Sequence, residues 1–485
     1  MLKDKYNFYS DNIPIEVKVE SQEGEFVFIY KVNISKISES TEIVLDKIRE
    51  ELVDKVKLGI SDITDPKKMD FIKKKFKDTI LYLINKYFPD LTEDMRDFFT
   101  TYLMQKSFGL GKLEILLSDN QLEEIVVNNA DEPVWVYHHK HGWLKTNVIL
   151  KDEGLINHYA SLIGRKVGRS ITLLNPLLDA HLTTGDRVNA TLAPITSKGN
   201  TLTIRKFSAR PITITDMLLN KTISVSAAAL IWMAIQYELS ILVAGGTATG
   251  KTSFLNVISS FFPPNQRVVS IEDTRELQLS KYLHWVPMVS REPNPEGKGE
   301  ISMLDLVVNS LRMRPDRIVV GEIRRKREAE VLFEAMHTGH SVYATLHAND
   351  TEETITRLTN PPIEISKALL PAISLVVVMY RNRRTGIRRV FQISEILKDS
   401  TANTLMQFDL ASDRILNANN SIRVFPELGM QTGLTTQEID TDLKDKAEIL
   451  KWLANKKIYN IDEVGKVIST YYINKESLMK FISKK

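Results

Sequence analysis

Five short apolar runs between residues 222 and 398 constrain the fold of this chain more than any other feature. They alternate with segments of helix length, and they are ILVAG (241–245), RVVSIE (267–272), RIVVGE (317–322), SVYATLH (341–347) and SLVVVMY (374–380). Strands that are apolar along their whole length are typical of a parallel sheet covered by helices on both faces. The pattern therefore predicts an α/β nucleotide-binding core over residues 222–400.

A glycine-rich loop follows the first run and precedes the helical stretch SFLNVISSFF. It consists of Gly245, Gly246, Thr247, Ala248, Thr249, Gly250, Lys251, Thr252 and Ser253. Glycines let successive backbone N–H groups turn toward an anion, and the positive end of the following helix adds to the attraction. In such a loop the lysine reaches the β- and γ-phosphates and the threonine hydroxyl reaches Mg²⁺. We expect a phosphate loop for ATP and Mg²⁺ here; the other interpretation is a turn that binds nothing.

Polar residues end three of the other runs: Glu272, Glu322 and His347. Ligands of open α/β sheets gather at the carboxyl ends of the strands, which places these side chains near the phosphate loop. Taken singly, such an acid is more often a helix cap or an ion-pair partner, and such a histidine is more often structural. Together with the loop, they predict metal binding, water activation and a γ-phosphate contact.

Four segments, in order, resemble the signature motifs of the type II/type IV secretion ATPase superfamily. They are GGTATGKTS (Walker A), SIEDTREL (aspartate box), SLRMRPDRIVVGEIR (Walker B) and EAMHTGHSVYATLHAND (histidine box). Upstream, FGLGKLEILLSDNQLEEIVVN and LLDAHLTTGDRVNATLAPITSKGNTLTIRKF resemble the domain that precedes the motor core. The resemblance covers roughly residues 108–400. It implies a RecA-like P-loop NTPase core and a homohexameric cytoplasmic ATPase that powers assembly of pili, archaella or pseudopili through a polytopic membrane platform protein.

The resemblance also assigns roles to single residues. It gives Lys251 to the phosphates and Thr252 to Mg²⁺, and it makes Glu272 the acid that polarises water. Glu322 becomes the Walker B glutamate near metal and water, and His347 becomes a phosphate sensor.

Three arginines match positions that this family sets against the nucleotide or in its core. They are Arg187 in GDRVNA, Arg205 in TIRKF and Arg312 in SLRMRPD. The other interpretation of each is an ion pair at the surface or between domains.

The absence of cysteine separates this chain from part of the family. Bacterial type II members and many pilus-assembly relatives carry a four-cysteine zinc insert in the motor domain. Here the segment SLVVVMYRNRRTGIRRVFQISEIL predicts a hairpin turning at Thr385-Gly386, and this simpler ending resembles the archaeal branch, which drives archaella or archaeal type IV pili. The arginines of this hairpin predict a solvated rim or a subunit contact; they are Arg381, Arg383, Arg384, Arg388 and Arg389.

The rest of the chain predicts further domains. Residues 1–100 are rich in lysine and glutamate and suggest a small accessory domain. Residues 101–210 contain short strand-like runs, LEILL (113–117) among them, and predict an α+β domain. Residues 211–221 form the expected linker, and residues 401–485 a C-terminal extension without identified chemistry.

Three clustered histidines, His138, His139 and His141, raise the question of a metal site. No acidic or cysteine partner lies at ligand spacing, and the segment alternates like the edge of a hairpin. We therefore expect solvated histidines and no metal there.

Charge and hydropathy narrow the function. Lys and Arg number 64 and Asp and Glu 61, a balance of +3 that argues against a nucleic-acid coat, so no stable nucleic-acid partner is expected. The start of the chain predicts no signal peptide, and the longest apolar stretch, interrupted by Pro371, is too short to span a bilayer. We expect a cytoplasmic protein held at the inner face of the membrane by its partner. The alternatives are a nucleic-acid or DNA-transfer translocase and a scaffold that does not hydrolyse nucleotide.

Overall fold

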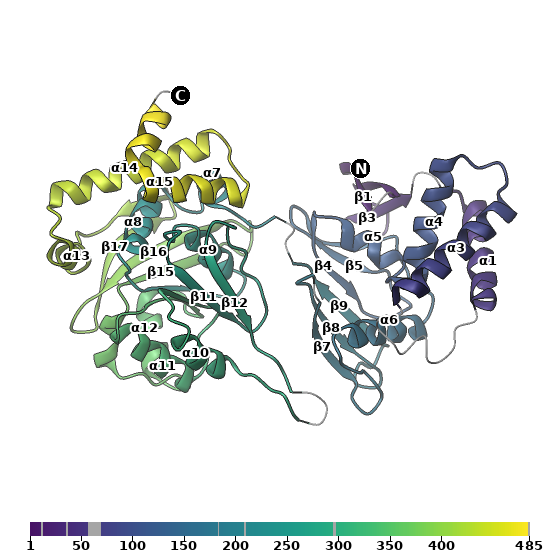
Figure 1. Ribbon diagram of the computed structural model, residues 1–485, viewed down its shortest axis with the longest axis horizontal. Coiled ribbons are helices and arrows are strands. Elements are labelled where there is room, and N and C mark those ends of the chain that lie inside the picture. Colours follow the sequence, from purple (N-terminus) through teal and green to yellow (C-terminus); the bar gives the residue numbers. More distant parts are fainter. Residues whose placement is uncertain are drawn as a thin grey trace. The chain divides into compact units, whose positions relative to one another are not determined.

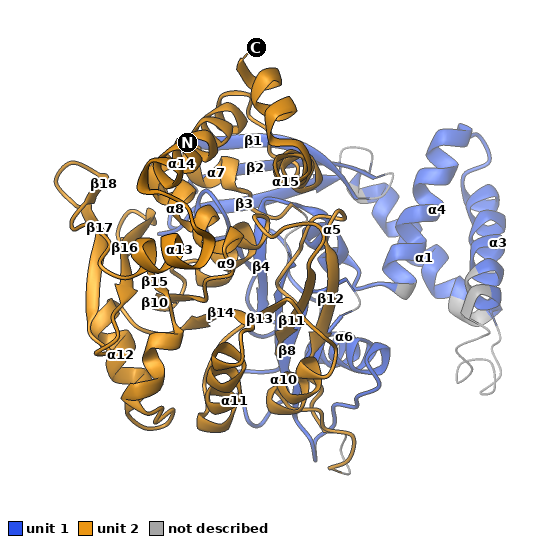
Figure 2. Ribbon diagram, turned by 60° about the vertical axis from the view of Figure 1, so that its left-hand side comes forward, with its two compact units in different colours: residues 1–209 blue, residues 210–485 orange. Residues whose placement is uncertain are grey.

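The computed structural model describes residues 1–10, 13–34, 37–56, 69–182, 184–207, 210–293 and 297–483. The chain forms two compact units, residues 1–209 and 210–485, which Figure 2 colours separately. Each unit contains a nine-stranded sheet and its own hydrophobic core.

Unit 1 is built on a sheet with the strand order β1-β2-β3-β6-β5-β4-β9-β8-β7. Its strands are β1 (Leu2–Ser10), β2 (Ile13–Glu20), β3 (Ile29–Ile34), β4 (Leu122–Val127), β5 (Trp135–His138), β6 (Gly142–Thr146), β7 (Leu177–His181), β8 (Arg187–Thr191) and β9 (Thr201–Arg205). Its helices are α1 (Glu39–Lys55), α3 (Met69–Tyr87), α4 (Glu93–Phe108), α5 (Lys112–Ser118) and α6 (Glu153–Lys166). All its strand pairs are antiparallel except β3 with β6.

The N-terminal strands join the rest of unit 1 through this parallel pair. Ile29 and Tyr30 of β3 lie in register with Lys145 and Thr146 of β6, so β1–β3 continue the sheet of β4–β9. The sequence analysis divides this region at residue 100, whereas in the structure both parts share one sheet and one core.

Two other features of unit 1 differ from the predictions. The run LEILL lies in helix α5, because so short an apolar run fits a buried helix as well as a strand. The expectation of solvated histidines is wrong for His138 and His141. The His138 side chain is buried, and that of His141 is nearly so, with its Nε2 2.9 Å from Oδ2 of Asp4. Their hairpin, β5–β6, lies inside the sheet rather than at its edge, and only His139 is exposed.

Unit 2 has the strand order β12-β11-β13-β14-β10-β15-β16-β17-β18 (Figure 2). Its strands are β10 (Ile241–Gly245), β11 (Arg267–Glu272), β12 (His284–Val289), β13 (Arg317–Val320), β14 (Ser341–Leu346), β15 (Leu375–Arg381), β16 (Arg388–Ile396), β17 (Ala402–Asp409) and β18 (Arg414–Asn417). Its helices are α7 (Ile214–Leu219), α8 (Val225–Gln236), α9 (Lys251–Ser259), α10 (Met303–Leu311), α11 (Lys326–His337), α12 (Thr351–Thr359), the 3₁₀ helix η2 (Lys367–Ala372), α13 (Val424–Thr432), α14 (Thr436–Asn455) and α15 (Ile461–Ser483).

In this order, the six strands from β12 through β10 to β15 pair in parallel, and β15, β16, β17 and β18 pair antiparallel. Side chains of β10 alternate between two buried clusters. Ile241 and Val243 pack with α8, α9, α14 and α15, while Leu242 and Ala244 pack with α10 and α11. Both faces of the sheet are therefore covered, which confirms the α/β P-loop core and explains why these strands are apolar throughout.

Residues outside the predicted core complete unit 2. Helix α7 occupies most of the predicted linker and begins with a capping box between Thr213 and Asp216. The predicted C-terminal extension adds β17 and β18 to the sheet and α13–α15 to the core. Among the helices that the structure describes, none is long and apolar enough to cross a membrane.

Candidate nucleotide site

The loop between β10 and α9 has the backbone of an anion-binding turn. Its φ angles are positive at Gly245 (156°), Ala248 (60°) and Gly250 (92°). A Cβ at Gly245 would lie 2.5 Å from Oγ1 of Thr249 and 2.8 Å from the carbonyl oxygen of Met379. Gly245 is therefore required both by its conformation and by close packing.

The loop leaves its amides available. In the part of the chain described, the N–H groups of Gly246, Thr247, Ala248 and Gly250 donate no hydrogen bond to another backbone or side-chain group. The first N–H groups of α9 also have no partner within their helix. These donors, together with the positive end of α9, suit the phosphates of a nucleotide.

Lys251 is the charged centre of this loop. Its side chain is buried, and its Nζ donates to the carbonyl oxygen of Gly246 (3.0 Å) and to Nδ1 of His347 (3.2 Å). Burial lowers the pKa of the ammonium, and the charge of Glu322 opposes that shift. No carboxylate of the described residues forms an ion pair with Lys251, so its charge is available to an anion.

A chain of polar contacts continues across the carboxyl ends of the strands. His347 follows β14, and its Nε2 lies 3.2 Å from Oε1 of Glu322, which follows β13. Arg324 donates to Oε2 of Glu322 at 2.6 Å and 2.9 Å, and to Oδ2 of Asp273 at 2.7 Å. Burial and the charge of Lys251 lower the pKa of His347. The contacts fit a neutral imidazole that accepts from Lys251 and donates to Glu322.

Glu272 is the last residue of β11, and only one of its two carboxylate oxygens accepts hydrogen bonds from the described residues. Its Oε1 accepts hydrogen bonds from the N–H groups of Glu276 (2.9 Å) and Leu277 (3.0 Å), while its Oε2 is buried without a partner among the described residues. The residue is 2% exposed, and burial raises its pKa to about 7. A carboxylate with a free oxygen and a pKa near neutrality can accept a proton from water.

The chemistry of two side chains suits a magnesium ion. The Thr252 hydroxyl opens the first turn of α9 and makes no hydrogen bond within the described residues, and Glu322 offers a carboxylate. Hydroxyl and carboxylate oxygens are the hard ligands that Mg²⁺ prefers. Both oxygens of Glu322 already have partners, Arg324 and His347, which would have to yield to a metal.

A cavity of about 350 Å³ lies beside the phosphate loop. It is lined by Ile212, Met217, Asn220, Thr222, Thr249, Gly250, Ser253, Met379, Gly386, Ile387, Arg388 and Arg389. Arg388 closes one side, with Nε 3.3 Å from the carbonyl oxygen of Ala248. Its lining mixes apolar side chains, such as Met217 and Met379, with a larger number of polar ones, and both kinds are available to a nucleoside.

The hairpin β15–β16 turns at Thr385-Gly386, where Gly386 has a φ of 74°. The expectation of a solvated or subunit-contacting rim is wrong for Arg389, which is buried and forms a two-pronged ion pair with Asp413 (2.8 Å and 2.9 Å). Arg383 and Arg384 at the tip are exposed.

The three predicted arginines belong to other elements than the phosphate loop. Arg187 and Arg205 lie opposite each other on the neighbouring strands β8 and β9 of unit 1. Nη2 of Arg187 lies 2.6 Å from Oδ2 of Asp179. Arg312 caps α10 in unit 2 and is exposed. The roles of these three arginines toward nucleotide stay predictions.

Arg324 and Arg388 contact the site, yet sequence reasoning did not single them out for it. Arg324 stands two residues after Glu322, in the Walker B segment, and this proximity was the available signal. Arg388 reaches the loop from the hairpin, 140 residues along the chain from Ala248. Nothing local in the sequence marks that contact.

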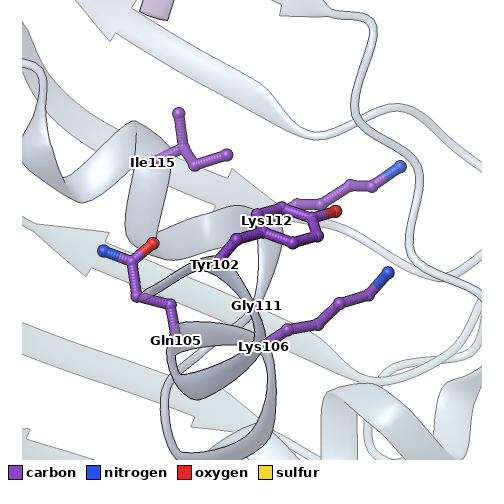
Figure 3. Close-up of a pocket in the computed structure, with 6 residues that line it drawn as sticks. All are labelled: Tyr102, Gln105, Lys106, Gly111, Lys112 and Ile115. Carbon is purple, nitrogen blue, oxygen red and sulfur yellow. The ribbon is translucent and has the colours of Figure 1, made fainter. Parts of the chain in front are cut away.

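A second cavity, in unit 1, is drawn in Figure 3. It measures about 10 Å³, space for one water molecule at most, and Tyr102, Lys106 and Lys112 border it. Both lysines already have acidic partners, since Lys106 lies 2.6 Å from Asp46 and Lys112 lies 3.7 Å from Glu42. This cavity is too small for an organic ligand.

Comparison with known proteins places these features in a family. Residues 108–394 match the family model described as "Type II/IV secretion system protein". Two uncharacterized proteins of Methanocaldococcus jannaschii are similar. MJ0781 is 39% identical over 70% of this chain and 46% of its own length, and MJ0900 is 32% identical over 79% of this chain and 71% of its own. The chain thus spans about half the length of MJ0781.

The chain is also similar to proteins whose names state the system to which they belong. The type IV secretion system protein PtlH of Bordetella pertussis is 31% identical over 58% of this chain and 92% of its own length. Among solved structures, the Legionella pneumophila ATPase DotB is 20% identical with a TM-score of 0.42, covering 74% of this chain and 94% of that one. The pilus retraction motor PilT with bound ADP has a TM-score of 0.42 at 15% identity, covering 77% and 96%.

The family model covers more than half of the chain, and its span contains the phosphate loop, both acids and the histidine described above. This chain belongs to the Type II/IV secretion system protein family.

Proposed function

We propose that this chain is the motor of an archaeal filament-assembly machine, which couples ATP hydrolysis to the assembly of a type IV pilus or archaellum through a membrane platform protein. The main support for ATP hydrolysis is a combination of two features. The phosphate loop has backbone N–H groups without acceptors, and the buried carboxyl group of Glu272 has one oxygen without a partner among the described residues. A loop without the acid would favour a nucleotide-dependent scaffold.

Binding comes first. The free amides of the loop and the ammonium of Lys251 hold the phosphates, and the neighbouring cavity takes the nucleoside. Thr252 and Glu322 would hold Mg²⁺, which supplies charge neutralisation to the phosphates. Release of Glu322 from Arg324 accompanies that step in this proposal.

Hydrolysis then depends on Glu272. Its Oε2 accepts the proton of a water whose oxygen forms a bond to the terminal phosphorus as the bond to the bridging oxygen breaks. His347 contacts Lys251 through Nδ1 and Glu322 through Nε2. Because Lys251 holds the phosphates in this proposal, loss of the terminal phosphate changes the charge near Nδ1. Arg187, Arg205 and Arg312 are proposed to bind nucleotide differently before and after hydrolysis, and that difference in free energy drives the stroke.

The oligomer and its membrane partner are inferred from the relatives of the chain and from its composition. Two relatives more than 30% identical come from M. jannaschii, and the chain has no cysteine for a four-cysteine zinc insert. We infer a homohexamer at the inner face of the cell membrane, bound there by a polytopic platform protein. Co-purification of the co-encoded platform protein with the full chain tests this, and its absence from the complex in detergent would contradict the partner.

Replacing Lys251 by Ala tests the site. We expect loss of phosphate release over multiple turnovers and of filament assembly, because no other ammonium lies in the loop. Glu272→Gln should bind ATP with unchanged affinity but fail to hydrolyse it. Wild-type rates in the Lys251 variant would contradict the site, and loss of binding in the Glu272 variant would assign that acid a structural role.

Transfer of nucleic acid is the second candidate. The putative conjugal transfer protein Rv3659c of Mycobacterium tuberculosis is 34% identical over 52% of this chain and 72% of its own length. If this chain shares such a role, single-stranded DNA at moderate salt should stimulate its ATPase rate. An unchanged rate would contradict the role in nucleic-acid transfer.

A further inference from the structure

The C-terminal helix α15 lies against the loop that follows Glu272. This loop, residues 273–283, joins β11 to β12, and it supplies both N–H groups that hold Oε1 of Glu272. Its next residue, Gln278, donates its N–H to Oδ1 of Asn256 in α9 (2.8 Å). One end of the loop thus orients the acid and fastens it to the phosphate-loop helix.

The other end of the loop rests on α15. Asp462 accepts the N–H of Lys281 at 3.0 Å through Oδ1, and its Oδ2 lies 3.4 Å from the ammonium of the same lysine. Ser280, 2% exposed, faces Gly465 of α15 so closely that a Cβ there would lie 2.5 Å from the serine Cβ and closer still to its Oγ. Glycine inside a helix costs about 1 kcal/mol relative to alanine, and here it permits this contact.

The same helix is fixed to the rest of the motor core. The Tyr472 hydroxyl accepts from Nε1 of Trp232 (3.0 Å) and donates to the carbonyl oxygen of Phe261 (2.7 Å), just beyond the end of α9. Tyr459, which precedes α15, lies under the guanidinium of Arg210 at the start of unit 2, 5.1 Å from the ring centre. Figure 1 shows α14 and α15 in yellow, beside α8. Helix α15 therefore has fixed points on both sides of the loop contact.

We propose that Gly465 and Asp462 are positioning residues for Glu272. Their contacts with residues 280 and 281 hold the 273–283 loop in place, and this loop orients the carboxyl group of Glu272 and its free oxygen. The inference rests on the hydrolytic role proposed above for Glu272. It gives a function to the C-terminal residues, in which the sequence showed no chemistry.

The main test is the pair Gly465→Ala and Gly465→Ala with Ser280→Gly in the full chain. The single variant should lower kcat by about tenfold or more, since displacement of a catalytic group by about 1 Å has effects of this size, while its Kd for ATP stays at the wild-type value. The second substitution removes the serine side chain that the new methyl group meets, so kcat should recover. Asp462→Ala should lower kcat with unchanged Kd as well.

Lys475→Ala is the matched control. Lys475, in the second half of α15, pairs with Asp442 and Asp445 of α14, and neither pair involves residues 280 and 281. We expect it to lower the melting temperature without changing kcat at a temperature where the protein is folded. Faster hydrogen exchange of amides 276–281 in Gly465→Ala, but not in Lys475→Ala, would locate the effect in the loop.

The outcomes separate two failures. A wild-type chain without ATPase activity would overturn the proposed function itself. An active wild-type chain whose Gly465→Ala variant is folded and retains full kcat would overturn the positioning role, as would a loss of kcat that Ser280→Gly does not restore.

Discussion

At the scale of single residues, burial creates the properties that the proposed chemistry needs. Glu272 is removed from water at the end of β11, and this desolvation raises its pKa to about 7 despite two N–H donors. Burial also lowers the pKa of Lys251 and of His347 beside it. In all three groups, burial therefore favours the neutral form.

The raised pKa of Glu272 predicts a dependence of stability on pH. Its pKa is higher in the folded chain than in the unfolded chain, so folding favours the protonated form, and stability is lost as pH rises from 4.5 through about 7. Glu272→Gln cannot ionise and should therefore be more stable than the wild type at pH 8, by about 0.5–2.5 kcal/mol after the cost of an unpaired amide. Urea unfolding at pH 5.5 and pH 8 measures this. An advantage that does not grow with pH would contradict the burial argument.

The sequence predicts the phosphate-loop residues and the acids because motif and strand end coincide. It cannot predict that Arg324 joins Glu322 to Asp273, or that Arg388 meets Ala248, because these contacts depend on how separate loops pack. The same limit applies to His138. Its burial follows from the position of its hairpin inside a sheet, which is set by strands more than a hundred residues earlier.

At the scale of elements, the strands of unit 2 are the most predictable part. The run 241–245 coincides with β10 and the run 267–272 with β11, because both contain β-branched residues and lie between segments of helix length. Strands β1 and β2 are not among the predicted elements, although IPIEVKVE of β2 alternates between inward apolar and outward residues as a half-buried strand does. Helix α5 is mistaken for a strand because its apolar run is short.

The pairing of α14 with α15 contains a buried charge that can be tested. Lys446 is fully buried, and it donates to Asp442 on its own helix and to the hydroxyl of Tyr471 on α15 (2.8 Å). Asp442→Ala leaves this ammonium without its carboxylate and should destabilise unit 2 by about 3–5 kcal/mol, whereas Lys446→Met removes the buried charge and should cost less. Urea unfolding gives both values, and an equal or larger loss in Lys446→Met would contradict this account.

At the scale of the whole molecule, the chain divides once, near residue 209, rather than into an accessory domain, a preceding domain and a core. Composition suggested the division at residue 100, since lysine and glutamate dominate the first part. Composition does not show strand pairing, and the parallel pair of β3 and β6 joins the two parts.

Deleting residues 1–34 should therefore unfold unit 1 rather than remove a separable module. The deletion exposes the edge of β6 and discards the fully buried Val17, Val19 and Tyr30 together with Ile13 and Ile15. At about 1.5–3 kcal/mol for each buried side chain, roughly 10 kcal/mol is lost, as much as the whole stability of a typical domain. Circular dichroism melting and size-exclusion chromatography measure this. A soluble deletion variant with wild-type melting would contradict the single-sheet arrangement.

The place of α15 in the order of synthesis has a consequence for the cell. The phosphate loop and Glu272 leave the ribosome well before residues 461–483, which hold the loop behind that acid. A nascent chain that ends before α15 therefore lacks the contacts that hold this loop, together with the part of the core that α15 supplies. Under the positioning role proposed above, efficient hydrolysis would have to wait until translation has passed this helix.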